Sequence, residues 1–340
     1  MKERKQHMTM KDIARVFGIS TATVSRALNN NESISLKRRQ EIQKYAEEHN
    51  FLPNAIAESL RNNKVAPTKI IGVIIPQFVH YYFSSILSGI EKEAEINGYR
   101  IMVAQSEELY EKEVKICRSF ASMHVCGVIV SQAKDTVKYD HFTKMTDSGI
   151  PLVFYDRICT GLNTSRVVVD DYAGAFNAVS YMIERGCRNI AFFGGPSNLE
   201  ISKNRYNGYR DALLKHGIKP DDNLKFQCDN ETNAEAIMPL VMNSQHRPDG
   251  LFAVNDETAI GAMRTALSIG INVPNELSVC GFTNSLLSRV FGLTTVEQRG
   301  EKVGREAVRI LIRHVEGLIP DGQIEKHVVS TKLIVRNSTK

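Results

Sequence analysis

From residue 69 onward, the chain alternates between short apolar runs rich in β-branched residues and longer stretches with helical periodicity. Strands separated by helical stretches at this spacing are joined by crossover connections, which favour parallel sheets over hairpins. The length accommodates two such sheets. We expect strands over residues 69–75, 100–104, 125–131, 151–156, 166–170, 189–194, 250–254, 277–282 and 332–336, with helical stretches that include 83–97, 173–185 and 255–269.

The positive charge of the chain is concentrated in its first fifth. Residues 1–66 carry 12 Lys and Arg against 7 Asp and Glu, whereas the other 274 residues carry 31 of each. The net charge of +5 therefore belongs to a small N-terminal segment. Such asymmetry suggests a small module that meets a polyanion and a larger neutral module with another task.

Three short helices are expected in that basic segment. Thr9 followed by Asp12 is typical of a capping box, and Gly18 ends the first helix. Ser20 is placed to cap a second helix, and a third begins at Ser35. Two short helices joined by a tight glycine turn indicate a helix-turn-helix motif.

The second helix has two distinct faces. Val24, Ala27 and Leu28 lie on one side, whereas short polar residues and Arg26 lie on the other. Short side chains such as Thr21 and Ala22 bring a helix close to a major groove, and an arginine fork pairs with guanine. The alternative is a three-helix bundle whose polar face is only solvated.

The run TMKDIARVFGISTATVSRALN (residues 9–29) and the segment FLPNAIAESL (residues 51–60) resemble the DNA-binding headpiece of the lactose-repressor (LacI/GalR) family. The resemblance implies a headpiece over residues 1–52 and a hinge helix with linker over residues 53–66. It implies a partner, double-stranded DNA with a near-palindromic operator. The implied DNA-binding residues are Thr9, Ser20, Thr21, Ala22, Thr23, Ser25, Arg26, Asn29, Asn54, Ala57 and Leu60.

Within the implied hinge, Leu60 resembles the leucine that wedges into the minor groove, and Ala57 the small residue beside it. An apolar wedge unstacks a base step and kinks the duplex. The alternative for Leu60 is a buried residue of an interdomain linker.

The resemblance continues through the rest of the chain and implies two periplasmic-binding-protein-like subdomains. The fold class is thus α/β, with an N-terminal all-α headpiece followed by two doubly wound parallel-sheet subdomains. The chain is expected to cross between them near Val169, Gln298 and Val328. We expect the effector-binding and dimerisation core over residues 67–340, its N-subdomain over about 69–168 and 299–327, and its C-subdomain over about 169–298 and 328–340.

A ligand cleft between the subdomains is implied, with its side chains at the C-terminal ends of strands. Alternatives remain open: the two acids could cap helices, the arginine could be a surface ion-pair partner, and the two aromatic residues could serve only packing. Asp170 and Asp171 open a helix and are expected to cap it. The implied effector-binding residues are Tyr82, Phe83, Asp156, Arg205, Asn255, Asp256, Thr283 and Gln298.

Two departures from the family pattern bear on the effector. Thr283 and Asn284 stand where the family usually has two aspartates, so a carboxylate that commonly binds sugar hydroxyls is missing. Asn230 stands where related repressors often carry an aromatic residue that stacks on the ligand. The resemblance implies a carbohydrate effector, and the two departures argue against direct transfer of a galactoside or purine and leave an acidic sugar as one alternative.

Other function classes find little support in the sequence. The nine histidines show no metal-ligand spacing, the six cysteines form no Cys-x-x-Cys pair, and no nucleotide-binding glycine motif follows a strand. We expect no catalytic residues, no metal and no cofactor. A charged start without an apolar stretch argues against a secreted binding protein and for a cytoplasmic one.

The expected oligomer is a homodimer, because a helix-turn-helix that reads one half-site usually works as a twofold pair. No leucine heptads follow residues 332–336, so a tetramer is not expected. No membrane association is expected, since no apolar run approaches the length of a bilayer span.

Overall fold

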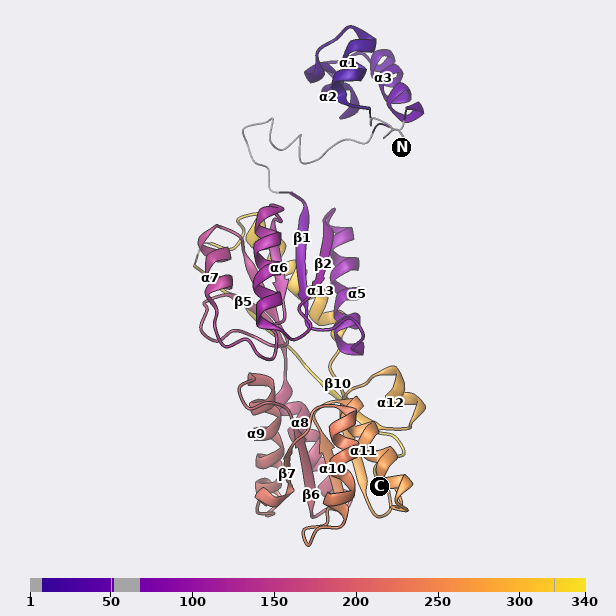
Figure 1. Cartoon of the computed structure of the whole chain (residues 1–340), viewed down its shortest axis with the longest axis vertical. Helices are drawn as coiled ribbons and strands as arrows, with labels where there is room; N and C mark the ends of the chain where they lie inside the picture. Colours follow the sequence, from indigo (N-terminus) through magenta and orange to yellow (C-terminus); the bar gives the residue numbers. More distant parts are fainter. Residues whose placement is uncertain (1–7, 50, 52–67, 321) are drawn as a thin grey trace, which may run out of the picture. The chain divides into compact units, whose positions relative to one another are not determined.

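The computed structural model describes residues 8–49, 51, 68–320 and 322–340. These residues fall into two compact units, Met1–Thr68 and Lys69–Lys340. The expected hinge over residues 53–66, with Asn54, Ala57 and Leu60, lies outside the described residues. Figure 1 shows both units, with labels on many of their elements.

The first unit is a bundle of three helices, α1 (Met10–Phe17), α2 (Thr21–Leu28) and α3 (Leu36–Glu48). Thr9 and Asp12 form the expected capping box, and Gly18 ends α1 in the left-handed conformation at φ 62°. Ser20 caps α2 by accepting from the backbone N–H of Thr23. Their shared core is small: Ile13, Ala14, Val24, Ala27, Ile42 and Ala46 are buried in it.

The first lobe of the second unit is a parallel six-stranded sheet in the order β11-β5-β4-β3-β1-β2. Helices α5 and α13 cover one face, and α6 and α7 cover the other (Figure 1). Its strands are β1 (Ile70–Ile75), β2 (Arg100–Gln105), β3 (Gly127–Val130), β4 (Leu152–Tyr155), β5 (Ser165–Val169) and β11 (Lys326–Val329), and its helices are α5 (Tyr81–Ile96), α6 (Tyr110–Ser122), α7 (Asp140–Asp147) and α13 (Gly300–Val315).

The second lobe repeats this plan in the order β12-β10-β9-β8-β6-β7. Only β12 runs antiparallel within this sheet, pairing with β10 at the edge. Helices α10 and α11 cover one face, and α8 and α9 cover the other. The strands are β6 (Ile190–Gly194), β7 (Lys225–Gln227), β8 (Gly250–Ala253), β9 (Ser278–Thr283), β10 (Thr294–Glu297) and β12 (Lys332–Ile334); the helices are α8 (Asp171–Glu184), α9 (Glu200–Lys215), α10 (Glu231–Met242), α11 (Asp256–Ser268) and the short α12 (Leu286–Val290), with a 3₁₀ turn at Asp222–Leu224.

The predicted fold class is confirmed: a helical unit precedes two parallel-sheet lobes. The chain passes between the lobes after β5, after β10 and after β11. Because Val328 and Val329 pair with β5 as part of the first sheet, the third passage comes at Ser330 and Thr331 rather than at Val328. The added pairing of β11 at the sheet edge explains this shift.

Candidate functional sites

The exposed face of α2 carries the predicted recognition residues. Ala22, Arg26 and Asn29 are exposed, and Thr21 and Ser25 are partly so, while Val24 and Ala27 are buried against the other two helices. The predicted division of the helix into two faces is therefore the one that the structure has. The structure records no ion pair or hydrogen bond for the Arg26 guanidinium within the described residues, so its fork is available to an outside acceptor.

The hydroxyls at the helix starts serve the fold locally. Thr9 donates to the Asp12 carboxylate at 2.6 Å, and the Ser20 and Thr23 hydroxyls lie 2.9 Å apart. These bonds fix the angle at which the chain enters α1 and α2. The helix ends are therefore preorganised, and the one proton of the Thr9 hydroxyl is already donated to Asp12.

Two side chains of α3 hold the end of α2 in place, a role that the sequence did not reveal. Arg39 donates to the backbone carbonyl of Asn30 at 2.6 Å. Gln43 donates to the carbonyl of Ala27 at 3.0 Å and to the Asn30 side chain at 2.8 Å. Since carbonyls at a helix C-terminus lack intrahelical partners, these bonds satisfy groups that would otherwise need water.

The two lobes of the second unit enclose a cavity of about 460 Å³. Its lining residues come directly after the C-terminal ends of strands in both sheets, which is the usual ligand crevice of open parallel sheets. The volume is within the range of small-molecule sites. From the first lobe these residues include Gln77, His80, Tyr82, Phe83, Glu108, Lys134, Asp156 and Arg157, and from the second Ser202, Arg205, Asp229, Asn230, Val254, Asn255, Glu257, Thr283 and the crossing residue Gln298.

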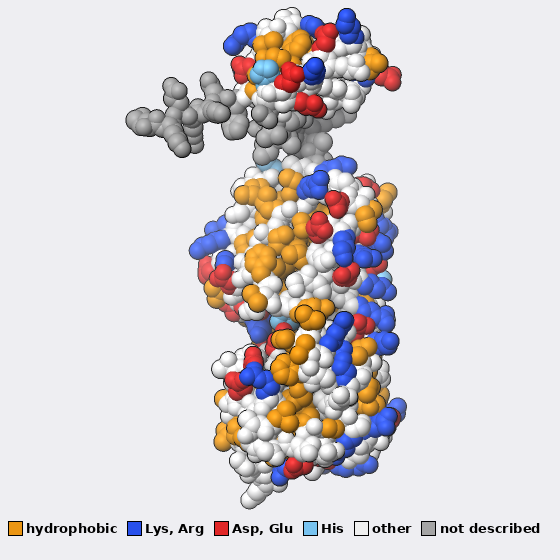
Figure 2. Space-filling view, turned by 90° about the vertical axis from the view of Figure 1, so that its right-hand side faces the viewer, with side chains coloured by type: hydrophobic (Ala, Val, Ile, Leu, Met, Phe, Trp, Pro, Cys, Tyr) orange, Lys and Arg blue, Asp and Glu red, His pale blue; other side chains and the backbone are white. Residues whose placement is uncertain are grey.

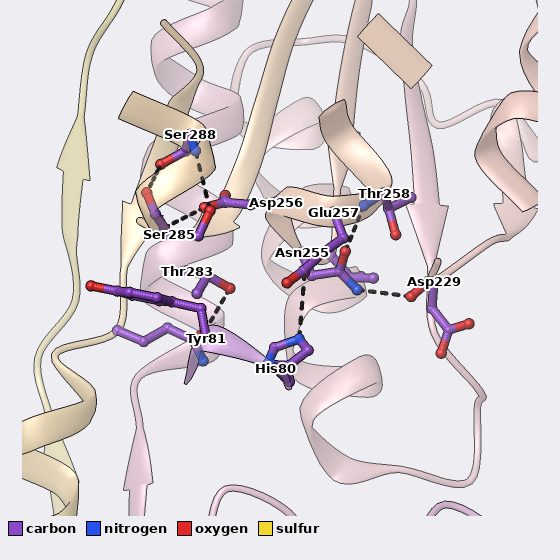
Figure 3. A network of polar contacts seen from close by, with 12 residues as sticks. His80, Tyr81, Asp229, Asn255, Asp256, Glu257, Thr258, Thr283, Ser285 and Ser288 are labelled. Atoms are coloured by element: carbon purple, nitrogen blue, oxygen red, sulfur yellow. Dashed lines mark hydrogen bonds and ion pairs between the residues drawn. The ribbon is translucent and has the colours of Figure 1, made fainter. Parts of the chain in front are cut away.

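Of the predicted effector residues, all but Asp256 line this cavity. Asp256 is fully buried inside the second lobe, where its carboxylate accepts from the Ser285 backbone N–H at 2.7 Å and from the Thr295 hydroxyl. As the first residue of α11 it turns toward β10, whereas Asn255 before it reaches the cavity and caps the helix (Figure 3). Asp256 thus anchors the loop after β9.

Arg205 is held rigidly at the cavity wall. Its Nε donates to Asp171 at 2.7 Å, its Nη1 donates to the Val254 carbonyl, and its guanidinium stacks on the Phe282 ring. Burial raises the pKa of Asp171 to about 6, although the Arg205 charge and hydrogen bond act in the opposite direction. Asp170 caps α8, as predicted, whereas Asp171 is a buried ion-pair partner.

Asp156 is the cavity acid that accepts no hydrogen bond from the described residues. It is 4% exposed, and within the described residues its carboxylate accepts no recorded hydrogen bond; Arg157 Nε lies 4.0 Å away. Burial raises the pKa of Asp156 despite the attraction of Arg157, Arg205 and His80. A buried carboxylate without a hydrogen-bond donor is costly, and this one lies at the cavity surface.

The remaining cavity acids already have partners. Glu108 accepts from Arg157 at 2.5 Å, and Asp229 accepts from Lys134 at 2.7 Å. His80 Nε2 lies 3.4 Å from Glu257, a contact visible in Figure 3. Burial opposes ionisation of Glu257, but His80 outweighs it and lowers the pKa.

The sequence interpretation did not include these paired residues among the site residues. The signal available for most of them was their position: His80, Glu108, Lys134, Arg157 and Glu257 each follow an expected strand within a few residues, whereas Asp229 follows β7, which was not expected. Motif matching alone favoured the family's known positions, so these charged residues were missed.

Two classes of function find no support in the described part of the chain. None of its helices has the length and apolar character needed to cross a membrane. Its His, Cys, Asp and Glu side chains form no group of three or more that could hold a metal ion.

Comparisons with known proteins decide the family. Residues 9–54 match the family model described as "Bacterial regulatory proteins, lacI family", and residues 179–339 match the "Periplasmic binding protein-like domain". The chain is 30% identical to the HTH-type transcriptional repressor PurR of Vibrio atlanticus over 98% of each chain. It is also 30% identical to catabolite control protein A of Priestia megaterium, covering 98% of this chain and 100% of the relative.

The chain belongs to the lacI family of bacterial regulatory proteins. It is a DNA-binding transcriptional regulator. Its fold also matches the lac repressor dimer bound to operator, with a TM-score of 0.85 at 21% identity over 98% of this chain and 99% of that one. A lacI-type regulator from Alkaliphilus metalliredigens in complex with D-xylulofuranose is 27% identical, with a TM-score of 0.70 over 80% of this chain and all of that one.

Proposed function

We propose that this regulator changes its affinity for DNA when a neutral, hydroxyl-rich small molecule, a sugar or sugar derivative, binds in the cavity between the lobes. The carboxylate of Asp156, which accepts no hydrogen bond from the described residues, carries the proposal. A carboxylate accepts from two hydroxyls, and such charge-assisted bonds are stronger than neutral ones. The apolar ring of Phe83 beside it suits the C–H face of a sugar.

The charge balance of the cavity supports a neutral ligand over an acidic one. Arg205 is paired with Asp171, Arg157 with Glu108, and Lys134 with Asp229. An acidic sugar would compete with the paired acid for each of these cations, at a cost of several kcal/mol where a buried acid loses its partner; among the described residues, Arg157 Nε makes no hydrogen bond and lies 4.0 Å from Asp156. Free donors suited to hydroxyl oxygens remain at Gln298 Nε2 and the Tyr82 hydroxyl, both buried without a partner.

We propose that α2 enters the major groove of the operator. Arg26 would pair with guanine through its fork, and Thr21 and Ala22 would contact base edges or a thymine methyl. Ser20, Thr23, Ser25 and Asn29 flank this face, and Thr9 lies at the start of α1, where it can meet a phosphate. Asn54, Ala57 and Leu60, outside the described residues, complete the proposed contacts, with Leu60 as the minor-groove wedge.

A homodimer on a near-palindromic operator follows from reading half-sites. The large exposed apolar side chains of the core support it. Figure 2 views the core from the side of α5 and α12, and apolar side chains gather on this face in both lobes. On and just after α12, Leu286, Leu287, Val290 and Phe291 are all exposed. We infer a non-enzymatic regulator without cofactor that acts in the cytoplasm.

Control by the effector would follow from a shift between two arrangements of the lobes. A ligand that contacts both lobes binds one arrangement more tightly and increases its population. In a dimer, that shift changes how the two headpieces are presented to their half-sites. Whether the ligand releases or promotes DNA binding follows from which arrangement fits the operator.

The test selects genomic fragments with the purified full chain at one stated salt concentration. Recovery of a near-palindromic site is expected, and neighbouring genes then nominate the effector. Neutral and acidic sugars are next compared by calorimetry, with the operator present and absent. Recovery of random, salt-sensitive fragments alone, or binding of acidic sugars only, would contradict the respective half of the proposal.

A further inference from the structure

Two charged contacts and one hydrogen bond join the lobes at the edge of the cavity. Lys134 Nζ of the first lobe lies 2.7 Å from Asp229 Oδ2 of the second. Asn198 of the second lobe donates to the backbone carbonyl of Lys134 at 3.1 Å. His80 and Glu257 make the further cross-lobe contact at 3.4 Å. Lys134 therefore meets the opposite lobe through both its side chain and its backbone.

A buried acid inside the first lobe holds the loop that carries Lys134, residues 131–139. Glu113 is fully buried on α6 and accepts from the Ala133 backbone N–H at 2.8 Å and from the Thr136 hydroxyl at 2.7 Å. Its third contact is His141 Nε2 at 2.9 Å. A buried carboxylate with several donors holds its partners in one arrangement, so the loop keeps a defined shape without regular secondary structure.

A second acid fixes Lys134 itself. Glu108 accepts from the Lys134 backbone N–H at 3.0 Å and also pairs with Arg157. On the opposite lobe, the Asp229 backbone carbonyl accepts from Asn255 Nδ2 at 2.9 Å, as Figure 3 shows. The backbone at both ends of the ion pair is therefore already fixed by hydrogen bonds. Because of this, forming the ion pair when the lobes close loses little conformational entropy beyond that of the two side chains.

We propose that Lys134 and Asp229 form an ionic clasp that holds the two lobes together over the cavity and thereby sets its affinity for effector. Both are positioning residues, because they act on the arrangement of the lobes. The inference rests on the proposed function only in taking the cavity as the effector site. Their side chains are 34% and 18% exposed, so water screens them less than a fully exposed pair.

The clasp affects the affinity for effector by changing the fraction of molecules in which the two lobes are closed. If only the closed core binds tightly, the apparent dissociation constant rises by the factor by which the closed fraction falls. Removing one charge should lower the closed-to-open ratio about fivefold, as expected for a partly exposed pair. High salt should also lower the closed fraction of the parent protein, and its effect should be smaller once the clasp is gone, because the His80–Glu257 contact then remains between the lobes.

The experiment needs neither effector nor DNA. The chain contains no tryptophan, so a Thr232→Trp substitution at the exposed start of α10, on the cavity lining, gives one tryptophan that can be excited apart from the eleven tyrosines. In the full chain carrying this reporter, acrylamide quenching is measured between about 20 mM and about 500 mM NaCl. Lys134→Met, Asp229→Asn and the reversed pair K134D/D229K are compared. Lys138→Met, an exposed lysine of the same loop, removes the same charge away from the opposite lobe.

The expected result is stronger quenching in Lys134→Met and Asp229→Asn at low salt, with a smaller salt dependence than in the parent. The reversed pair should recover most of the parent behaviour, and Lys138→Met should match the parent. Quenching in Lys134→Met equal to that of the parent, or a reversed pair as open as the single variants, would overturn the clasp. Because the measurement uses no ligand, a negative result for the clasp would leave the proposed effector class unaffected. Equally, a wrong effector class would leave the result for the clasp unaffected.

Discussion

The exposed face of α2 and the cavity between the lobes use charge in opposite ways. On α2, Arg26 is exposed, and within the described residues no partner is recorded for it. In the cavity, Arg205 and Arg157 are buried and bonded to acids. The arginine on α2 is accessible to an outside anion, whereas the arginines of the cavity are already paired with acids of the protein and form part of the cavity wall.

Because of this difference, substitution of an arginine should have different consequences in the two regions. An exposed arginine contributes to an encounter but little to folding, because water solvates it in both states. A buried arginine in an ion pair leaves an uncompensated carboxylate when it is removed. Substitutions can therefore separate binding from stability in one region and not in the other.

The largest effect is expected for Arg205→Ala. Loss of the guanidinium leaves Asp171 buried without its partner and the Val254 carbonyl without its donor, so the free energy of unfolding should fall by about 3–5 kcal/mol. The effector response should be lost as well, while the headpiece keeps its helices. Denaturant titration and effector-dependent DNA binding measure the two parts. Arg205→Lys is the matched control, and an alanine variant as stable as the parent would contradict the structural role.

Asp156→Asn should reduce effector affinity without reducing stability, in contrast to Arg205→Ala. The carboxylate makes no recorded hydrogen bond with the described protein, so the amide should leave the free energy of unfolding unchanged or higher. Effector affinity should fall by about 1.5–3 kcal/mol, because a charged acceptor is lost. Calorimetry with the effector from the sugar comparison measures the loss.

Asp256→Asn is the control for that experiment. Asp256 holds Ser285 and Thr295 inside the lobe, so its substitution should lower stability more than affinity. Equal effects of the two substitutions on affinity would remove Asp156 from its proposed role.

The two regions also differed in how far the sequence predicted them. The helical unit was predicted down to its caps, because Thr9, Gly18 and Ser20 act on neighbours three or four residues away. The sheet order is formed by residues far apart, yet the strand–helix alternation and the family resemblance indicated its parallel character. The added pairing of β11 with β5 gave no local signal, which is why the boundary at Val328 was two residues early.

For the cavity, the sequence indicated which residues lie at strand ends but not which way their side chains point. Asn255 and Asp256 are adjacent at a strand end, and only the start of α11 decides that the first faces the cavity and the second the lobe interior. Likewise, nothing local to Lys134 or Asp229 shows that they meet across the lobes. Pairs of this kind depend on tertiary placement, which spacing along the chain does not contain.

Arg26→Ala tests the exposed region. Specific DNA binding should weaken by about 1–3 kcal/mol and lose preference at one base pair of each half-site, without a change in the free energy of unfolding. Arg15→Ala, on α1 with a side chain that is 82% exposed, removes the same charge from the same unit as a control. Competition with single-base operator variants measures the preference. An unchanged base preference in Arg26→Ala would place the contact elsewhere.

The smallest effect concerns the pH dependence of the buried pair. The pKa of Asp171 is raised to about 6 by burial, so near pH 5.5 the folded state binds a proton that the unfolded state has largely released. Stability from this group is therefore present at low pH and lost as the pH rises through about 6. Between about pH 5.5 and about pH 7.5, the parent should lose on the order of 1 kcal/mol relative to Asp171→Asn. A difference that is flat or rises over this range would mean that Arg205 keeps the carboxylate ionised throughout, and that the Arg205–Asp171 pair in the cavity wall does not make stability depend on pH.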